Sequence, residues 1–180
     1  EQAKTYPHNL GEGKLYGTQE NDINYWLGCA YDLLGDQKKA RQYWHEASVG
    51  LAVPSAALFY NDQQPDKIFY QGLALLKLGE KEEANLRFSN LVAYGETHFH
   101  DDVKLDYFAI SLPDLLIWEE NLNKRNQIHC NYLIGLGRLG LNELSASNLA
   151  FQSVIEQDAY HLAAAIHLKL LTLAIQPENA

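Results

Sequence analysis

The sequence has few of the residues that mark a metal site, a stapled secreted domain or a membrane span. It contains two cysteines, Cys29 and Cys130, with no CxxC pair. Structural zinc sites and disulfide scaffolds use clustered or numerous cysteines, so neither is expected, and both cysteines are predicted to lie free within helices. The sequence has no run of about 18 apolar residues, which argues against a membrane-spanning helix and a membrane partner.

Positive charge is also scarce. The chain has 14 Lys and Arg residues against 23 Asp and Glu residues, which gives a net charge of −9. Nucleic-acid binding needs clustered Lys and Arg to neutralise phosphates, so no nucleic-acid partner is expected. The chain contains no methionine, and its beginning, EQAKTYPHNLGEGK, lacks the apolar segment of a signal peptide. We therefore expect a processed or excised part of a longer protein, with a cytoplasmic location.

Three stretches of the chain repeat the same types of side chain at the same offsets. Each combines a small residue, a turn residue, a second small residue, an aromatic and an apolar residue. The sets are Gly28, Gly35, Ala40, Trp44 and Ala47; Gly72, Gly79, Ala84, Phe88 and Leu91; and Gly135, Asn142, Ser147, Phe151 and Val154. This spacing is that of the helix pair in tetratricopeptide repeats.

Each stretch predicts two antiparallel helices. In the first, apolar residues recur at helical spacing, Asn21 or Asp22 can cap the first helix, Gly35 can end it and Asp36 can cap the second. Gly28 is small where the helices must approach closely, and an aromatic fills the wider gap. The predicted fold is therefore all-α: a single domain over 1–180, formed as a tetratricopeptide-repeat-like superhelix of antiparallel helix pairs.

The predicted units cover residues 21–50, 65–95 and 128–157, with insertions at 51–64 and 96–127 and a terminal helix at 159–174. Pro65 suits a first helical position. The third unit is the least regular, because Asn142 replaces the turn glycine and Arg138 stands where the other units have Tyr31 and Leu75. The terminal helix is apolar over much of its circumference, so it should cover the last unit or meet a neighbouring domain. The apolar insertion residues, Phe59, Tyr60, Leu112 and Leu115 to Trp118, are expected to fold back over one mouth of the superhelix.

Three strings carry a resemblance to a known family: NLGEGKLYGTQENDINYWLGCAYDLLGD, FYNDQQPDKIFYQGLALLKLG and LPDLLIWEENLNKRNQIHCNYLIGLG. They resemble the C-terminal region of a large bacterial family in which a domain of unknown function, a carbohydrate-related β-sandwich, precedes tetratricopeptide repeats. The resemblance runs from Tyr6 to about His161. It implies that the chain is the repeat-bearing tail of a longer protein, and it brings no catalytic residues. The string LNELSAS departs from the more usual Gly-Asp turn of the family's repeats.

Tetratricopeptide repeats bind partners on the concave surface lined by the first helix of each pair. The aromatic residues at the fifth position of each unit, Tyr25, Phe69 and Tyr132, suit an anchor for a peptide or another domain. The predicted lining also contains Asp22 and Asp66, with Lys77 as its strong cation, which argues against binding a terminal carboxylate. The alternative is that the insertions or another domain cover this surface. The predicted binding residues are Tyr25, Cys29, Asp32, Phe69, Leu73, Lys77, Tyr132 and Leu136.

Other polar groupings favour structural over catalytic interpretations. The segment from His98 to Asp102 has an H-x-H spacing, but a polar loop that caps a helix beginning near Asp101 explains it better than a metal site. Glu119 and Glu120 are adjacent, as are His129 and Cys130, and adjacent side chains point apart. His161 and His167 are six residues apart, which places them off a common helical face. No catalytic residue, metal or cofactor is therefore expected.

The favoured function is a non-catalytic scaffold that binds a protein or peptide, or that docks to the upstream domain of its own polypeptide. A second hypothesis makes it the accessory tail of a carbohydrate-active enzyme, in which a loop residue such as His100 or Trp118 contributes to a sugar site. A third makes it a structural spacer without an exposed groove.

Overall fold

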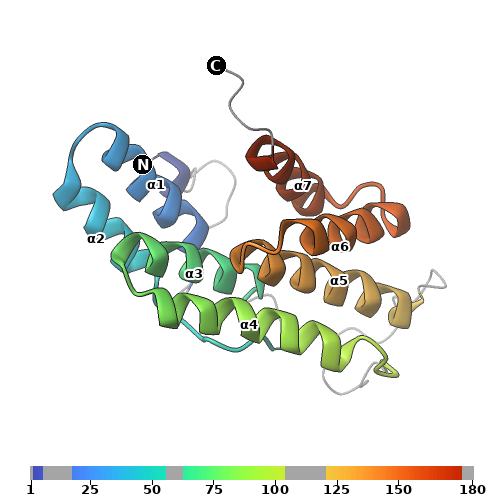
Figure 1. Cartoon of the computed structure of the whole chain (residues 1–180). Helices are drawn as coiled ribbons and strands as arrows, with labels where there is room; N and C mark the ends of the chain where they lie inside the picture. Colours follow the sequence, from blue (N-terminus) through green and yellow to red (C-terminus); the bar gives the residue numbers. More distant parts are fainter. Residues whose placement is uncertain (1, 6–17, 56–62, 104–120, 176–180) are drawn as a thin grey trace.

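The computed structural model describes residues 2–5, 18–55, 63–103 and 121–175, and every element assigned within them is helical (Figure 1). A short 3-10 helix, η1, comes first, and seven α-helices follow in the described residues. Their bounds are η1 Gln2–Lys4, α1 Asn21–Leu33, α2 Gln37–Ala47, α3 Asp66–Leu78, α4 Lys81–His98, α5 Leu122–Gly140, α6 Leu144–Gln157 and α7 Leu162–Ile175. None of these helices combines the length and the apolar composition needed to cross a bilayer.

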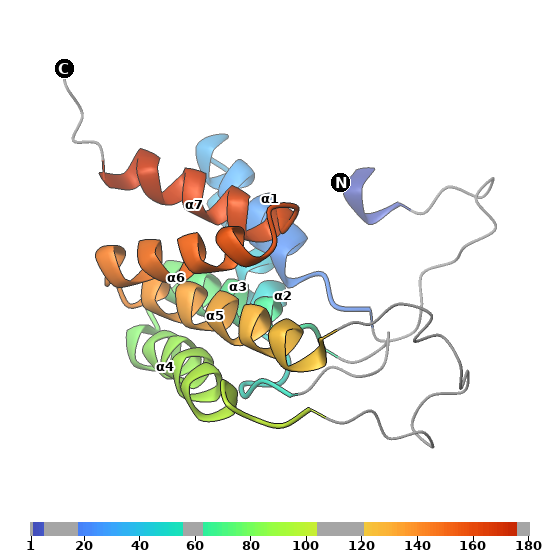
Figure 2. The same cartoon turned by 90° about the vertical axis from the view of Figure 1, so that its right-hand side faces the viewer.

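The helices pack in sequence order, which gives the fold its repeat-like character. Each α-helix contacts the next one along the chain, and α1, α3, α5 and α7 also contact one another in succession. Figures 1 and 2 both show α7, α6, α5 and α4 stacked in that order. Each helix pair therefore packs against the next pair along the chain.

In all three pairs a glycine faces the aromatic ring, so the glycine is small where the helices approach, as predicted, but the ring lies at that approach and not in a wider gap. Gly28 faces Trp44, Gly72 faces Phe88 and Gly135 faces Phe151. A Cβ atom on any of these glycines would lie less than 3.0 Å from the facing ring. The second small residue of each pair, Ala40, Ala84 and Ser147, is fully buried. The repeated spacing in the sequence therefore corresponds to one repeated side-chain contact between paired helices.

The turns within the pairs also repeat. Gly35 has φ +80°, Gly79 has φ +90° and Asn142 has φ +64°, so all three adopt the left-handed conformation that ends a helix. The prediction that Asn142 takes the place of the turn glycine is confirmed. Asp36 caps α2 as predicted, because its Oδ1 accepts a hydrogen bond from Lys39 N at 3.1 Å. These local signals explain why each chain reversal occurs where it does.

The main core lies between α3, α4, α5, α6 and α7, and a smaller cluster surrounds Trp44. Helices α4 and α5 belong to different pairs, but they approach as closely as the helices of one pair do. A Cβ atom on Gly95, Gly137 or Gly140 would lie less than 3.0 Å from an atom of the facing helix. Phe88 is consequently enclosed by Gly72 of α3 and Gly140 of α5. These glycines lie outside the repeated pattern, so that pattern did not indicate this second close approach.

Several predicted details are corrected. Asn21 does not cap α1: it is buried, and its Nδ2 donates to Ala47 O and Val49 O at 2.8 Å each. Helix α4 continues to His98 and α5 begins at Leu122, so the second insertion is shorter than the predicted 96–127. Asn121 starts α5 early because its Oδ1 accepts from Lys124 N. Similarly, α7 begins at Leu162 rather than at 159.

The face of the third unit at Arg138 is less buried than that of the second unit, as predicted, but not less than that of the first. Leu75 at the equivalent place is buried, whereas Tyr31 and Arg138 are both half-buried. Arg138 forms ion pairs with Glu143 and, at 2.9 Å, with Glu96, and these hydrogen bonds raise the pKa of its guanidinium. The apolar insertion residues, Phe59, Tyr60 and Leu112 to Trp118, lie outside the described residues.

Candidate docking surface

The predicted binding residues of the first pair lie in an aromatic patch where α1 meets α3. The ring of Tyr25 lies edge-on to Trp26, with centroids 5.1 Å apart, and 6.0 Å from Tyr70. Burial raises the pKa of the Tyr25 hydroxyl, and the neighbouring Cys29 raises it further. Tyr25 and Cys29 are half-buried, whereas Trp26 is 50% exposed. A partner can therefore reach this patch chiefly through Trp26, which was not among the predicted binding residues.

The carboxylates on this face have cationic partners. Lys67 Nζ lies 2.6 Å from Asp22 Oδ1, and Lys77 Nζ lies 3.9 Å from Asp32 Oδ2. Gln37 also donates to Asp32 Oδ1 at 2.6 Å. The prediction that Lys77 is the strong cation of this face is incomplete, because it overlooked Lys67. The ion pairs connect α1 to α3, so the acidic residues serve packing between the pairs.

The second and third members of the predicted aromatic row are covered, which agrees with the alternative that this surface is already occupied. Phe69 is 3% exposed and Tyr132 is 6% exposed, and Leu136 beside them is fully buried. The cause is α7, which carries His167 into the space between them. The His167 ring centroid lies 5.5 Å from Phe69 and 6.0 Å from Tyr132. The terminal helix therefore occupies this part of the predicted groove.

His167 is the centre of a group of rings that we call the His167 cluster; it consists of His167 with Phe69, Tyr70, Tyr132 and Phe151. The rings come from α3, α5, α6 and α7 and lie 5.5–6.3 Å from the His167 ring. His161 also contacts Tyr132, with centroids 4.8 Å apart. The prediction that His161 and His167 do not share a face is misleading, because His161 precedes α7 and is not subject to its helical spacing.

The remaining predicted binding residues differ in accessibility. Leu73 is half-buried against the core, and Lys77 is exposed with its ammonium group 5.4 Å from the Trp44 ring. His100 is exposed, and its ring lies edge-on to Phe99 at 4.9 Å. Trp118, the other residue proposed for a sugar site, lies outside the described residues, as do Glu119 and Glu120.

The outward face of α7 presents an apolar row that no prediction singled out. Leu162, Ile166 and Leu170, which we call the outer stripe, are 71%, 47% and 41% exposed. Their spacing of four residues places them on one side of the helix. The opposite side of α7, with Ala164, His167 and Leu171, is buried. This helix is therefore apolar on the side that packs and also on the side that faces solvent.

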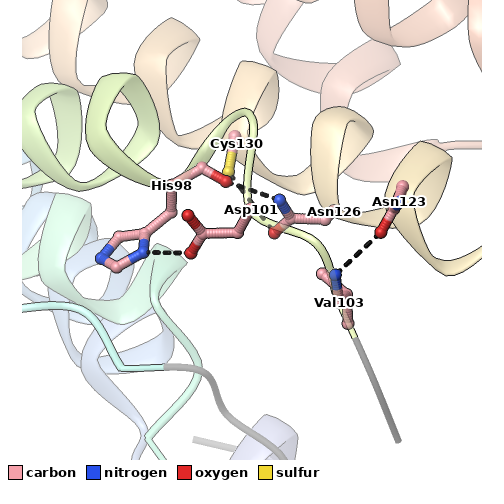
Figure 3. Close-up of polar contacts among 6 residues, drawn as sticks. All are labelled: His98, Asp101, Val103, Asn123, Asn126 and Cys130. Atoms are coloured by element: carbon pink, nitrogen blue, oxygen red, sulfur yellow. Dashed lines mark hydrogen bonds and ion pairs between the residues drawn. The ribbon is translucent and has the colours of Figure 1, made fainter.

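The polar segment after α4 closes a turn (Figure 3). His98 Nδ1 lies 2.6 Å from Asp101 Oδ2, and Asn126 Nδ2 donates to His98 O at 2.6 Å. Asp101 to Val103 are not helical, and residues 104–120 lie outside the described part of the chain. Asn123 accepts from Val103 N at 2.8 Å, so the side chains of α5 hold the end of this segment.

The chemistry available on this part of α5 is limited. Burial raises the pKa of the Cys130 thiol to about 11, which disfavours the nucleophilic thiolate. The Cys130 thiol lies 3.6 Å from Asn126 Oδ1, one turn earlier in α5. In the described ranges, no three His, Cys, Asp or Glu side chains come together as metal ligands.

Comparison with known proteins adds no identification. No family model matches the chain, and no solved structure matches it. The candidate site thus depends on the geometry alone. The sequence did not predict the outer stripe or the His167 cluster. The outer stripe could have been found, because the terminal helix was predicted to be apolar over much of its circumference.

Proposed function

We propose that this chain is a non-catalytic docking scaffold of tetratricopeptide-like helix pairs, and that a helical partner docks on α7. The repeated contact between a glycine and an aromatic ring supports the tetratricopeptide assignment. The packing of α7 supports its role, because α7 contacts α6 and α5 in the way that α5 contacts α4 and α3. Helix α7 thus takes the place of the first helix of a fourth pair.

The observation that carries this proposal is the outer stripe. The described sequence of α7, LAAAIHLKLLTLAI, contains one charged residue, Lys169. A helix that is apolar around its circumference is normally buried on both sides, and contiguous exposed apolar surface marks an interaction site. The matching partner surface is the apolar face of another helix. That helix would belong to a separate protein or to another part of the same polypeptide.

Site-specific photo-crosslinking tests this function. A photoreactive amino acid is placed at Ile166 in the complete polypeptide that carries this sequence, in the host that expresses it. We expect a covalent product of defined mass from this position, and its loss on Leu170→Glu. The matched control is Leu86 on α4, which is 49% exposed and therefore similar to Ile166 at 47%. Absence of a product at Ile166, or equal products at both positions, would contradict the proposal.

The variant must lose docking without losing its fold. Leu170 is 41% exposed, and surface substitutions usually change the free energy of unfolding by no more than about 0.5 kcal/mol. Leu170→Glu should therefore retain the wild-type far-UV circular dichroism spectrum and melting temperature. A large loss of stability in this variant would instead show that the stripe is part of the core.

A further inference from the structure

The contact that places α7 over Phe69 and Tyr132 depends on the buried His167 in its neutral form. We propose that α7 is an acid-sensitive cover: protonation of His167 loosens it from α3 and α5 and uncovers Phe69 and Tyr132. This inference goes beyond the proposed docking function, which requires only the outer stripe. It explains why Phe69 and Tyr132 are buried in the structure, and it predicts that they become exposed when the pH falls.

His161 caps α7 through its ring. Its Nδ1 accepts a hydrogen bond from Ala164 N at 3.1 Å. The same ring contacts Tyr132 of α5, with centroids 4.8 Å apart. His161 therefore ties the start of α7 to α5.

His167 opposes protonation by its surroundings. It is 4% exposed, and its Nδ1 lies 2.7 Å from Ala163 O, to which it must donate because a carbonyl oxygen only accepts. The Nε2 atom is buried without a hydrogen-bond partner among the described residues. A second N–H group there would place a charge among the rings of the His167 cluster without an acceptor, which is costly in an apolar environment. Burial accordingly lowers the pKa of His167.

The other titratable groups around His167 come from α3 and α5, because α6 contributes the uncharged ring of Phe151. From α3, Tyr70 is neutral, and Asp66 attracts a charged His167 and so opposes release. Burial raises the pKa of the Asp66 carboxyl, which reduces its negative charge as the pH falls. From α5, Tyr132 is neutral, and burial together with His161 lowers the pKa of His129. His129 therefore acts in the same direction as His167.

The sign of the pH effect follows from these directions. His129 and His167 have lowered pKa values in the folded state, so their contribution to the covered state is complete above the ordinary value of 6.5. That contribution is lost as the pH falls below 6.5. Asp66 acts in the opposite sense, because its pKa is raised in the folded state and its protonation therefore stabilises the fold as the pH falls through that raised value toward 3.8. Each histidine that must stay neutral can raise the opening equilibrium by up to about ten-fold per pH unit below 6.5.

Hydrogen exchange of the wild-type chain at pH 7.5 and pH 5.5 tests the inference, after correction for the intrinsic pH dependence of exchange. We expect the amides of α7 to open about 10- to 100-fold more at pH 5.5, because two histidines act over about one pH unit. The amides of α2 and α4 should change much less. The two histidines are His129 and His167, whose pKa values are both lowered in the folded state. The variant His167→Phe should therefore reduce the difference to no more than about ten-fold, since Phe fills the ring position without titrating and only His129 then contributes.

The control variant is His45→Gln, because His45 is exposed on α2 and should leave the pH effect unchanged. If His167→Phe fails to fold, His129→Gln should retain α7 protection at pH 7.5 and reduce the opening at pH 5.5. Equal opening of α2, α4 and α7 at pH 5.5 would overturn the inference, as would a wild-type α7 that stays protected. Crosslinking through Ile166 at pH 7.5 is a separate measurement, so the docking proposal and this one can fail independently.

Discussion

Phe88 is where the repeat contact and the interface between pairs meet, and it offers a quantitative test of the packing. Its side chain is fully buried between Gly72 of α3 and Gly140 of α5. Truncation to alanine removes the ring and leaves a cavity, which typically costs about 3–5 kcal/mol. For a chain of this size that corresponds to a fall of roughly 6–20 °C in the melting temperature. Leu86→Ala in the same helix is the control, because Leu86 is 49% exposed.

The glycine beside Phe88 makes the test sharper. Gly72→Ala gains about 1 kcal/mol of helix propensity, but the new Cβ would lie less than 3.0 Å from the Phe88 ring, and overpacking of a core costs about 1–3 kcal/mol. In the wild type the substitution should therefore be neutral or destabilising. In the Phe88→Ala background the ring is gone, so the same substitution should stabilise the chain by about 1 kcal/mol.

Thermal and urea unfolding followed by circular dichroism at 222 nm would measure all four members of this double-mutant cycle. The expected coupling energy between the two positions is about 1–3 kcal/mol. Additive effects within about 0.5 kcal/mol would refute the reasoning, because they would mean that Gly72 and the Phe88 ring do not compete for the same space.

Two further predictions concern the turns and the ends of the pairs. Gly79→Ala should lower the free energy of unfolding in urea by about 1–2 kcal/mol, because alanine is strained at φ +90°. Asn142→Gly should be neutral or stabilising, because glycine adopts positive φ without strain. Equal effects of the two substitutions would contradict the assignment of these turns. Asn21→Ala should lower the free energy of unfolding by about 1–3 kcal/mol, because it leaves two carbonyls near the end of α2 without their hydrogen-bond donor. The control Asn85→Ala should leave it almost unchanged, because Asn85 is exposed. A silent Asn21→Ala would show that this buried amide does not join α1 to α2.

The parts of the fold that were predictable are those encoded within a few turns of helix. The turn residues Gly35, Gly79 and Asn142 mark where each pair reverses, and the capping of α2 by Asp36 is a contact over three residues. The starts of α5 and α7 were harder to predict, because they depend on the local caps Asn121 and His161, which lie outside the repeated pattern.

The candidate site was less predictable, because it depends on contacts between distant parts of the chain. Tyr25, Phe69 and Tyr132 occupy equivalent positions, but Tyr25 is half-buried whereas the other two are covered by α7. Equivalent positions in a repeat have equivalent surroundings only where the neighbouring pairs are also equivalent. The position of α7 breaks that equivalence, and it brings His161 and His167 to the same tyrosine.

The sequence alone determined the helix pairs, since small residues, turn residues and aromatics at fixed offsets specify how two adjacent helices meet. It also determined that α7 would be apolar around its circumference. Only the tertiary structure decided which side of α7 is buried and which of the three aromatics it covers. The physical reason is that the position of each helix depends on how its side chains pack against the neighbouring pair. Small rotations between successive pairs add up along the row, so the position of the last helix depends on all the interfaces before it.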